Sequence, residues 1–146
     1  MIYAALAHLF AVMSPGPDTA IIIREVSLNK RIKWDLSNSP DIAQTIAVSC
    51  YGLGIGCDLE GLHTLKIKET DRLTALYNEL SLLGAKISVT DKSLHLAAGQ
   101  NFKKGITIST YDDHRMAMAF APLAIKIPLS IKKAEVVSKS LSLIHI

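Results

Sequence analysis

The chain has 146 residues with a formal net charge of +3, and 49% of its residues are hydrophobic. This length corresponds to about one domain, and the hydrophobic content allows a packed core, which excludes a largely disordered chain. Only 5% of the residues are aromatic and the basic residues are scattered, so small anions are favoured over nucleic acid as ligands. Cys50 and Cys57 form no CxxC pair and have no closely spaced histidines, so we expect buried, reduced thiols in a cytoplasmic protein rather than a zinc or redox site.

The first segment, residues 1–31, differs in composition from the rest of the chain. Two apolar runs, 2–13 and 20–23, are separated by the break at 14–18 (SPGPD). Neither run reaches the roughly 18 to 20 residues that span a bilayer, and no basic stretch typical of a secretory signal precedes them. An apolar helix packed on a core is one interpretation. Residues 9–18 (LFAVMSPGPD) also resemble the start of the lysine/threonine-type amino-acid exporter family, which predicts a foreign N-terminal segment.

From residue 32 onward the pattern alternates between helix and strand. Ser39, Pro40 and Asp41 supply an N-cap, a first helical position and an acidic first turn, which predict a helix that ends near Gly52 or Gly54. The other predicted elements, in chain order, are a strand over 57–62, a leucine-striped helix over 70–83 that Gly84 ends, a hairpin over 85–90 and 94–98, a strand over 105–109, a helix over 113–125 and strands within 129–137. They predict an α/β fold of repeated units, with helices packed on mixed β-sheets.

Two predicted helix starts combine acids and cations, namely residues 68–72 (KETDR) and 111–115 (YDDHR). A cation in the first turn of a helix faces the positive end of the helix dipole, so two such starts indicate a shared anion. Lys68, Glu69 and Arg72 share one face of their helix, where the cations can bind a phosphate or carboxylate while Glu69 moves a proton.

Each of these residues also has a purely structural interpretation. Lys68, Glu69 and Arg72 can form surface ion pairs, which contribute about 0 to 1 kcal/mol each. Asp41 can compensate a helix dipole. In the third helix Asp112 or Asp113 can act as the cap, with His114 as a capping or core residue and Arg115 paired to Asp112.

At these positions the chain resembles the enolpyruvylshikimate phosphate synthase (EPSP synthase) family. The segments that carry the resemblance, in family order, are 39–45 (SPDIAQT), 67–73 (IKETDRL), 110–120 (TYDDHRMAMAF) and 137–140 (VSKS). The resemblance implies the shikimate pathway of aromatic amino-acid biosynthesis. The reaction would be transfer of the enolpyruvyl group from phosphoenolpyruvate to shikimate 3-phosphate, without a metal or organic cofactor.

The resemblance also implies residue roles. Asp41 would be the base on the attacking hydroxyl, in contact with shikimate 3-phosphate, and Glu69 the acid and base on the enolpyruvyl group. Arg72, Arg115 and Lys139 would bind the phosphate and carboxylate of phosphoenolpyruvate. Lys68 would lie at the shared substrate site, and His114 would support it.

The family builds its site between two domains, and residues 32–140 correspond to part of the C-terminal one. We therefore expect half of a site with negligible turnover, no membrane or nucleic-acid partner for 32–140, and a non-homologous tail at 141–146. Three alternatives stay open at this point: a related transferase acting on a nucleotide sugar, a non-catalytic anion-binding α/β module, and a membrane-associated transporter fragment formed by residues 1–31.

Overall fold

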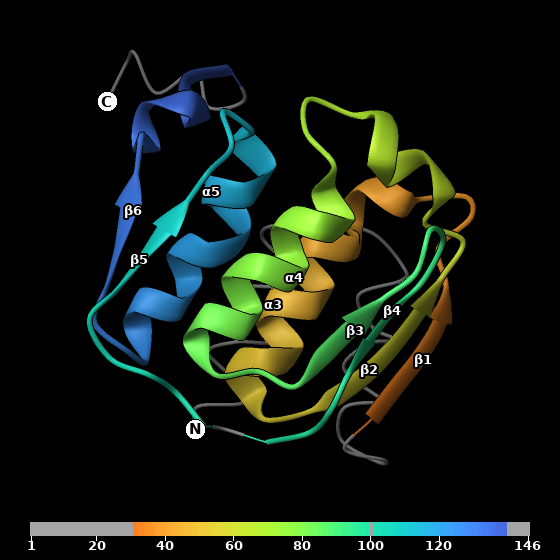
Figure 1. The fold of residues 1–146 in the computed structure, drawn as a ribbon, viewed down its shortest axis with the longest axis horizontal. Helices are drawn as coiled ribbons and strands as arrows, with labels where there is room; N and C mark the ends of the chain where they lie inside the picture. The colour runs from red at the N-terminus through yellow and green to blue at the C-terminus, as the bar shows by residue number, and fades with distance from the viewer. Residues whose placement is uncertain (1–30, 100, 140–146) are drawn as a thin grey trace.

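A computed structural model of the chain describes residues 31–99 and 101–139. In this part of the chain, helices α3, α4 and α5 form a layer between two β-sheets (Figure 1). One sheet has four strands in the order β1-β2-β4-β3, and the other consists of β5 and β6. The predicted α/β fold with helices packed on mixed sheets is confirmed.

The described elements form two α/β units, one around each sheet. The first unit contains β1 (Arg31–Asp35), α3 (Ala43–Leu53), β2 (Gly56–Glu60), α4 (Arg72–Leu83), β3 (Ile87–Val89) and β4 (Leu94–Leu96). Its β1 and β2 are parallel, whereas β4 runs antiparallel to β2 and β3. The second unit contains β5 (Ile106–Ser109), α5 (His114–Phe120) and β6 (Leu129–Lys132), with its two strands again parallel.

Three short 3₁₀ helices connect these elements and a fourth follows β6: η1 (Pro40–Ile42), η2 (His63–Ile67), η3 (Ala121–Ile125) and η4 (Ala134–Lys139). The helix ends predicted at Gly54 and Gly84 are confirmed, because both glycines follow their helices in the left-handed conformation. The third helix is shorter than predicted. It ends at Phe120 and continues as η3, because Pro122 has no N–H for the α-helical ladder. The strands predicted within 129–137 reduce to β6, and η4 follows.

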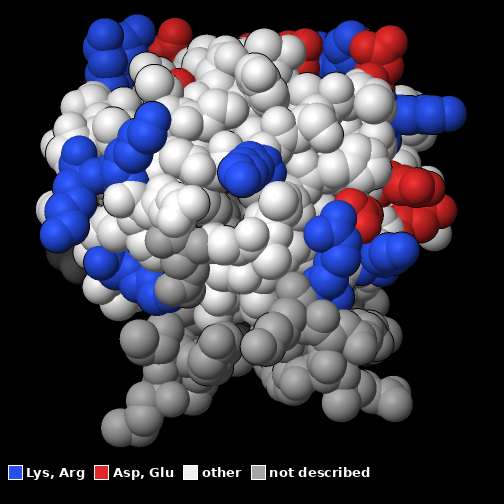
Figure 2. All heavy atoms as spheres, turned by 60° about the horizontal axis from the view of Figure 1, so that its bottom comes forward, with Lys and Arg blue, Asp and Glu red and all other residues white. Residues whose placement is uncertain are grey.

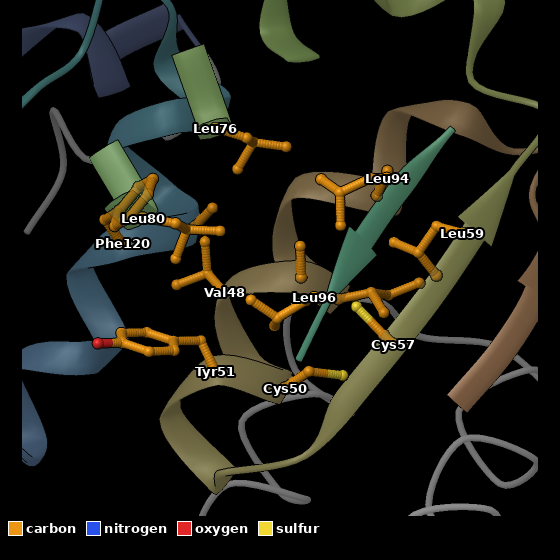
Figure 3. Packing of buried hydrophobic residues seen from close by; sticks show 14 of the residues in the cluster. Val48, Cys50, Tyr51, Cys57, Leu59, Leu76, Leu80, Leu94, Leu96 and Phe120 are labelled. Atoms are coloured by element: carbon orange, nitrogen blue, oxygen red, sulfur yellow. The ribbon is translucent and has the colours of Figure 1, made fainter. Parts of the chain in front are cut away.

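Helix α3 lies at the centre of the core, where every one of its residues except Thr45 is buried. Figure 3 shows Cys57 and Leu59 of β2 directed toward the helices. Cys50 and Cys57 are buried and free, as predicted. A hydrogen bond to Cys57, together with burial, raises the pKa of the Cys50 thiol, which keeps it protonated and unreactive.

The predicted foreign segment and tail fall on residues 1–31 and 141–146, of which Arg31 alone is described, as the first residue of β1. The division of the chain at residue 31 therefore stays a prediction. Among the described residues, no helix has the length and apolar character needed to cross a membrane.

Candidate active site

Three segments far apart in the sequence meet at the N-terminal ends of the helices, at the top of Figure 1. They are η1, the η2–α4 junction and the start of α5. We call the residues that meet there the Arg72 cluster: Asp41, Lys68, Glu69, Arg72, Asp113, His114 and Arg115. Six of the seven predicted site residues belong to it. The seventh, Lys139, ends η4, and its side chain lies outside the described structure.

Arg72, the first residue of α4, occupies the centre of the cluster with a side chain that is only 3% exposed. Its Nε donates to Asp113 Oδ2 at 2.6 Å, and Nη2 donates to Asp113 Oδ1 at 3.3 Å. Nη1 donates to Asp41 Oδ1 at 3.0 Å, and Nη2 also donates to Glu69 Oε2 at 2.6 Å. Burial disfavours the charged form of Arg72, but the bonds to Asp113 and Glu69 outweigh it and raise its pKa.

The other members of the cluster are more accessible to solvent. The side chains of Asp41, Lys68 and Glu69 are each between 35% and 39% exposed. Lys68 Nζ lies 3.4 Å from Asp41 Oδ1, and Arg115 Nη1 donates to the Asp41 carbonyl at 3.3 Å. His114 Nδ1 is 3.5 Å from Glu69 Oε1 and makes no hydrogen bond to any described residue. Two carboxylates and a lysine are thus open to a ligand above a buried arginine.

N-terminal helix caps fix the residues at which α4 and α5 begin, and both helices begin at the Arg72 cluster. Asp71 accepts the Thr74 backbone N–H at 3.1 Å and begins α4, and Asp113 accepts the Arg115 N–H at 2.9 Å and begins α5. Of the two predicted caps for the third helix, Asp113 is therefore the correct one. The predicted Ser39 cap is wrong, because the Ser39 side chain makes no capping bond and the helical segment opens with the 3₁₀ turn η1 before α3.

The expectation that a bound anion must compensate the cations is wrong for Arg72. Asp113, Asp41 and Glu69 supply its negative partners from within the protein. Arg115 differs, because no carboxylate of a described residue lies within ion-pair distance of it. Its predicted partner Asp112 is instead 3.1 Å from Lys133. Arg115 and the partly exposed Lys68 are therefore the cations most available to an external anion.

One residue of the cluster is not among the predicted site residues. Asp113 is predicted only as a possible cap, yet its fully buried carboxylate also holds Arg72 through two hydrogen bonds. The sequence carried a weak signal for this, since Asp112 and Asp113 are adjacent and one cap needs only one acid. Which of them faces Arg72 depends on packing between α4 and α5.

Glu69, Asp113 and His114 each offer one ligand atom, and these atoms lie within 4.8 Å of one another. A metal ion there would have to displace Arg72, which already binds both carboxylates at 2.6 Å. The donor set therefore fits an organised acid–base cluster better than a metal centre. That the reaction needs no metal stays a prediction from the family resemblance.

Comparisons with known proteins agree with the sequence motifs. The family model for EPSP synthase (3-phosphoshikimate 1-carboxyvinyltransferase) matches residues 2–145. The 3-phosphoshikimate 1-carboxyvinyltransferase of Bacteroides fragilis is 43% identical over 114 residues, covering 76% of this chain and 28% of that protein. The one of Methanoculleus marisnigri is 34% identical over 137 residues, covering 93% of this chain and 32% of that protein. The chain thus spans less than a third of the length of either relative.

A solved structure shows the same fold. EPSP synthase from Acinetobacter baumannii superposes with a TM-score of 0.64 over 71% of this chain and 25% of that one, at 22% sequence identity. The arrangement of helices between sheets is therefore shared with that enzyme.

Proposed function

Because the chain belongs to the EPSP synthase family, we propose that it carries half of a site that transfers an enolpyruvyl group from phosphoenolpyruvate to shikimate 3-phosphate. The observation that carries the proposal is the Arg72 cluster. Asp41, Glu69 and Arg115 reach one place from three segments that hold the family motifs. The chain spans 28% of the Bacteroides relative, so residues equivalent to the remainder would complete the site.

The two accessible carboxylates suit the two proton transfers of an addition–elimination. Asp41 takes the proton of the attacking hydroxyl as its oxygen bonds to C2 of phosphoenolpyruvate, and Glu69, starting as the carboxylic acid, gives its proton to the methylene carbon. In the elimination Glu69 removes a proton from the new methyl carbon. The C–O bond to phosphate then breaks and Asp41 gives its proton to the departing phosphate, leaving the enolpyruvyl ether and inorganic phosphate. Atoms and charges balance without an external oxidant, reductant or metal.

Arg72 orients these two carboxylates, since Nη1 binds Asp41 and Nη2 binds Glu69. Four of its five N–H donors are engaged, so it can give one further hydrogen bond to substrate. Arg115, Lys68 and Lys139 would then supply most of the positive charge on the phosphate and carboxylate of phosphoenolpyruvate. Preorganised charge of this kind stabilises a transition state more than a flexible arrangement does.

The alternative from another class is an anion-binding module without turnover, which the availability of Lys68 and Arg115 to an external anion favours. The transporter alternative rests on residues 1–31, almost all outside the described structure. The cytoplasmic location stays a prediction that rests on the two free cysteines, Cys50 and Cys57.

The test is phosphate release from phosphoenolpyruvate and shikimate 3-phosphate, measured with and without a separately supplied remainder of the enzyme. We expect turnover only in the mixture, and a loss of about 10²- to 10⁴-fold for Glu69→Gln because a general acid–base group is removed. Glu60→Gln, at an exposed carboxylate of β2, is the matched control. Turnover by the chain alone would contradict the half-site, and full activity of Glu69→Gln would contradict its role.

A further inference from the structure

Glu79 is a buried carboxylate that none of the proposed steps uses. It lies on α4 and is only 2% exposed. Oε2 accepts the backbone N–H of Ser109 at 3.1 Å, and Oε1 accepts the hydroxyl of Tyr111 at 2.8 Å. Ser109 is the last residue of β5, and Tyr111 lies in the loop that leads into α5. Glu79 therefore joins α4 to the beginning of the β5–α5 loop, residues 110–113.

Helix α4 holds this loop at both ends. Arg72 and Glu79 are seven residues apart, which is nearly two helical turns, so they share one face of α4 about 10 Å apart along the axis. Arg72 binds Asp113 at the end of the loop, while Glu79 binds at its start. Two side chains on one helix face thus bind the two ends of the loop that precedes α5.

The loop needs such support because its backbone is sterically unfavourable. Tyr111 and Asp112 are consecutive non-glycine residues in the left-handed region, with φ of 55° and 56°. Conformations of this kind persist only where the surroundings hold them. Thr110 contributes through a bond from Oγ1 to the Lys132 carbonyl at 3.1 Å, and Glu79 contributes the two bonds that it accepts from Ser109 and Tyr111. Burial raises the pKa of Tyr111, which keeps its hydroxyl a donor to Glu79.

A purely packing role does not explain a carboxylate at this position. Leu76 and Leu83, one turn before and one turn after Glu79 on α4, are buried leucines, and an apolar residue at position 79 would avoid the desolvation of a carboxylate. The two bonds to the β5–α5 segment compensate that desolvation. They also direct Glu79 to the one loop that presents Asp113, His114 and Arg115.

We propose that Glu79 is a positioning residue of the candidate active site. By holding Ser109 and Tyr111, it keeps the β5–α5 loop in the left-handed conformation that places Asp113 on Arg72 and sets Arg115 at the start of α5. The effect of Glu79 on the reaction rests on the proposed function, whereas its effect on the conformation of the loop does not.

The experiment compares Glu79→Met, Glu79→Gln and Tyr111→Phe in the full 146-residue chain. The first readout is the NMR signal of Arg72 Nε–H, whose hydrogen exchange reports its bond to Asp113, and the second is the affinity for phosphoenolpyruvate. Glu79→Met removes both acceptors, so we expect exchange to quicken and Kd to rise by about tenfold or more. Glu79→Gln keeps the shape and one acceptor and recovers most of the loss. Tyr111→Phe changes both readouts in the same direction by less.

Asp58→Asn is the control, because it breaks the ion pair between Asp58 and Arg31 on the four-stranded sheet and does not touch the β5–α5 loop. It should lower the urea midpoint but leave the Arg72 signal and the affinity unchanged. The proposal is overturned if the Glu79 variants lower the urea midpoint while Arg72 Nε–H exchanges as in the unsubstituted chain. If Glu79→Met does not fold, unchanged exchange of Arg72 Nε–H in both Glu79→Gln and Tyr111→Phe also overturns the proposal.

Failure of the proposed function is recognised separately. An unsubstituted chain that does not bind phosphoenolpyruvate would contradict the half-site, whereas the exchange of Arg72 Nε–H would still decide the role of Glu79. Weakened binding with an unchanged Arg72 signal would overturn the positioning role while supporting the site.

Discussion

Arg72 binds three carboxylates through one planar guanidinium, and this arrangement separates two kinds of residue within the Arg72 cluster. Its bonds to Asp113, Asp41 and Glu69 order the acids, while Lys68 and Arg115 keep charge available at the edge. A lysine at position 72 could not reproduce four directed bonds to three groups. At this scale the burial of a side chain, rather than its charge, decides whether it organises the site or faces a ligand.

Gln44 offers a residue-scale prediction about stability. Its side chain is 1% exposed in α3, and neither atom of its amide has a hydrogen-bond partner among the described residues. An unpaired buried amide costs about 1 to 3 kcal/mol, so Gln44→Met, which keeps the length and removes the polar atoms, should raise the free energy of unfolding by roughly that amount. Urea denaturation measures it. Gln44→Glu should lower the free energy of unfolding, because it buries a carboxylate without a partner. An unchanged urea midpoint for Gln44→Met would mean that the Gln44 amide has a hydrogen-bond partner in solution.

At the scale of elements, the pairing of β1 and β2 predicts a pH dependence. Asp58 of β2 receives two hydrogen bonds from Arg31 of β1, at 2.9 and 2.5 Å, and lies 3.0 Å from Nδ1 of His95 on β4. The bond from Arg31, with a smaller contribution from His95, lowers the pKa of Asp58. The folded-state pKa thus lies below the unfolded value of about 3.9, so the stabilisation is complete above pH 4 or so and is lost as the pH falls through the folded pKa.

Asp58→Asn tests this dependence. We expect the variant to be less stable near neutral pH and to lose less of its remaining stability on acidification, measured by urea unfolding between about pH 6 and pH 3. Glu60→Gln, at an exposed position of the same strand, is the matched control. If the stability of Asp58→Asn falls as steeply with decreasing pH as that of the unsubstituted chain, other carboxylates dominate the acid-induced loss of stability.

The elements predicted from the sequence are those whose ends depend on local chemistry. Gly54 and Gly84 end α3 and α4 through their own backbone conformation, and the hairpin of β3 and β4 forms across a short turn, as predicted. The order β1-β2-β4-β3 and the parallel pairing of β5 with β6 depend on contacts between distant segments. No local pattern encodes them. β1 itself is missing from the prediction, although apolar Ile32 and Trp34 alternate there with charged residues.

The same distinction applies to the candidate site. Asp41, Glu69 and Arg115 could be predicted because each belongs to a recognisable motif at a helix start. Asp113 and Glu79 could not be assigned their roles, since both act through neighbouring elements. For Glu79 a signal did exist, because an acid within the leucine stripe of α4 is unfavourable unless something binds it. Its partners on β5 and the following loop are 30 or more residues away in sequence.

At the scale of the whole molecule, the dipoles of the described helices decide where an anion is favoured. The N-terminal ends of α3, α4 and α5 gather at the Arg72 cluster, where the positive ends of their dipoles favour an anion. Figure 2 shows the molecule with the bottom of Figure 1 turned forward, where lysine and arginine side chains stand in separate groups, one of them in the middle of the surface, and acidic side chains lie beside those at the right. Anions should therefore bind at the end of the molecule that carries the cluster.

This arrangement predicts that an anionic ligand stabilises the whole chain. Asp41, Lys68 and Arg115 come together only in the folded state, so phosphoenolpyruvate should bind the folded chain alone and raise its free energy of unfolding, by about 2.7 kcal/mol at a hundred times Kd. Urea unfolding with and without the ligand, at constant ionic strength, measures the gain. Arg115→Gln should lose much of the gain. Lys33→Gln removes the same charge from an exposed position on β1 and should keep it. Equal losses in the two variants would show that the ligand responds to net charge and not to the Arg72 cluster.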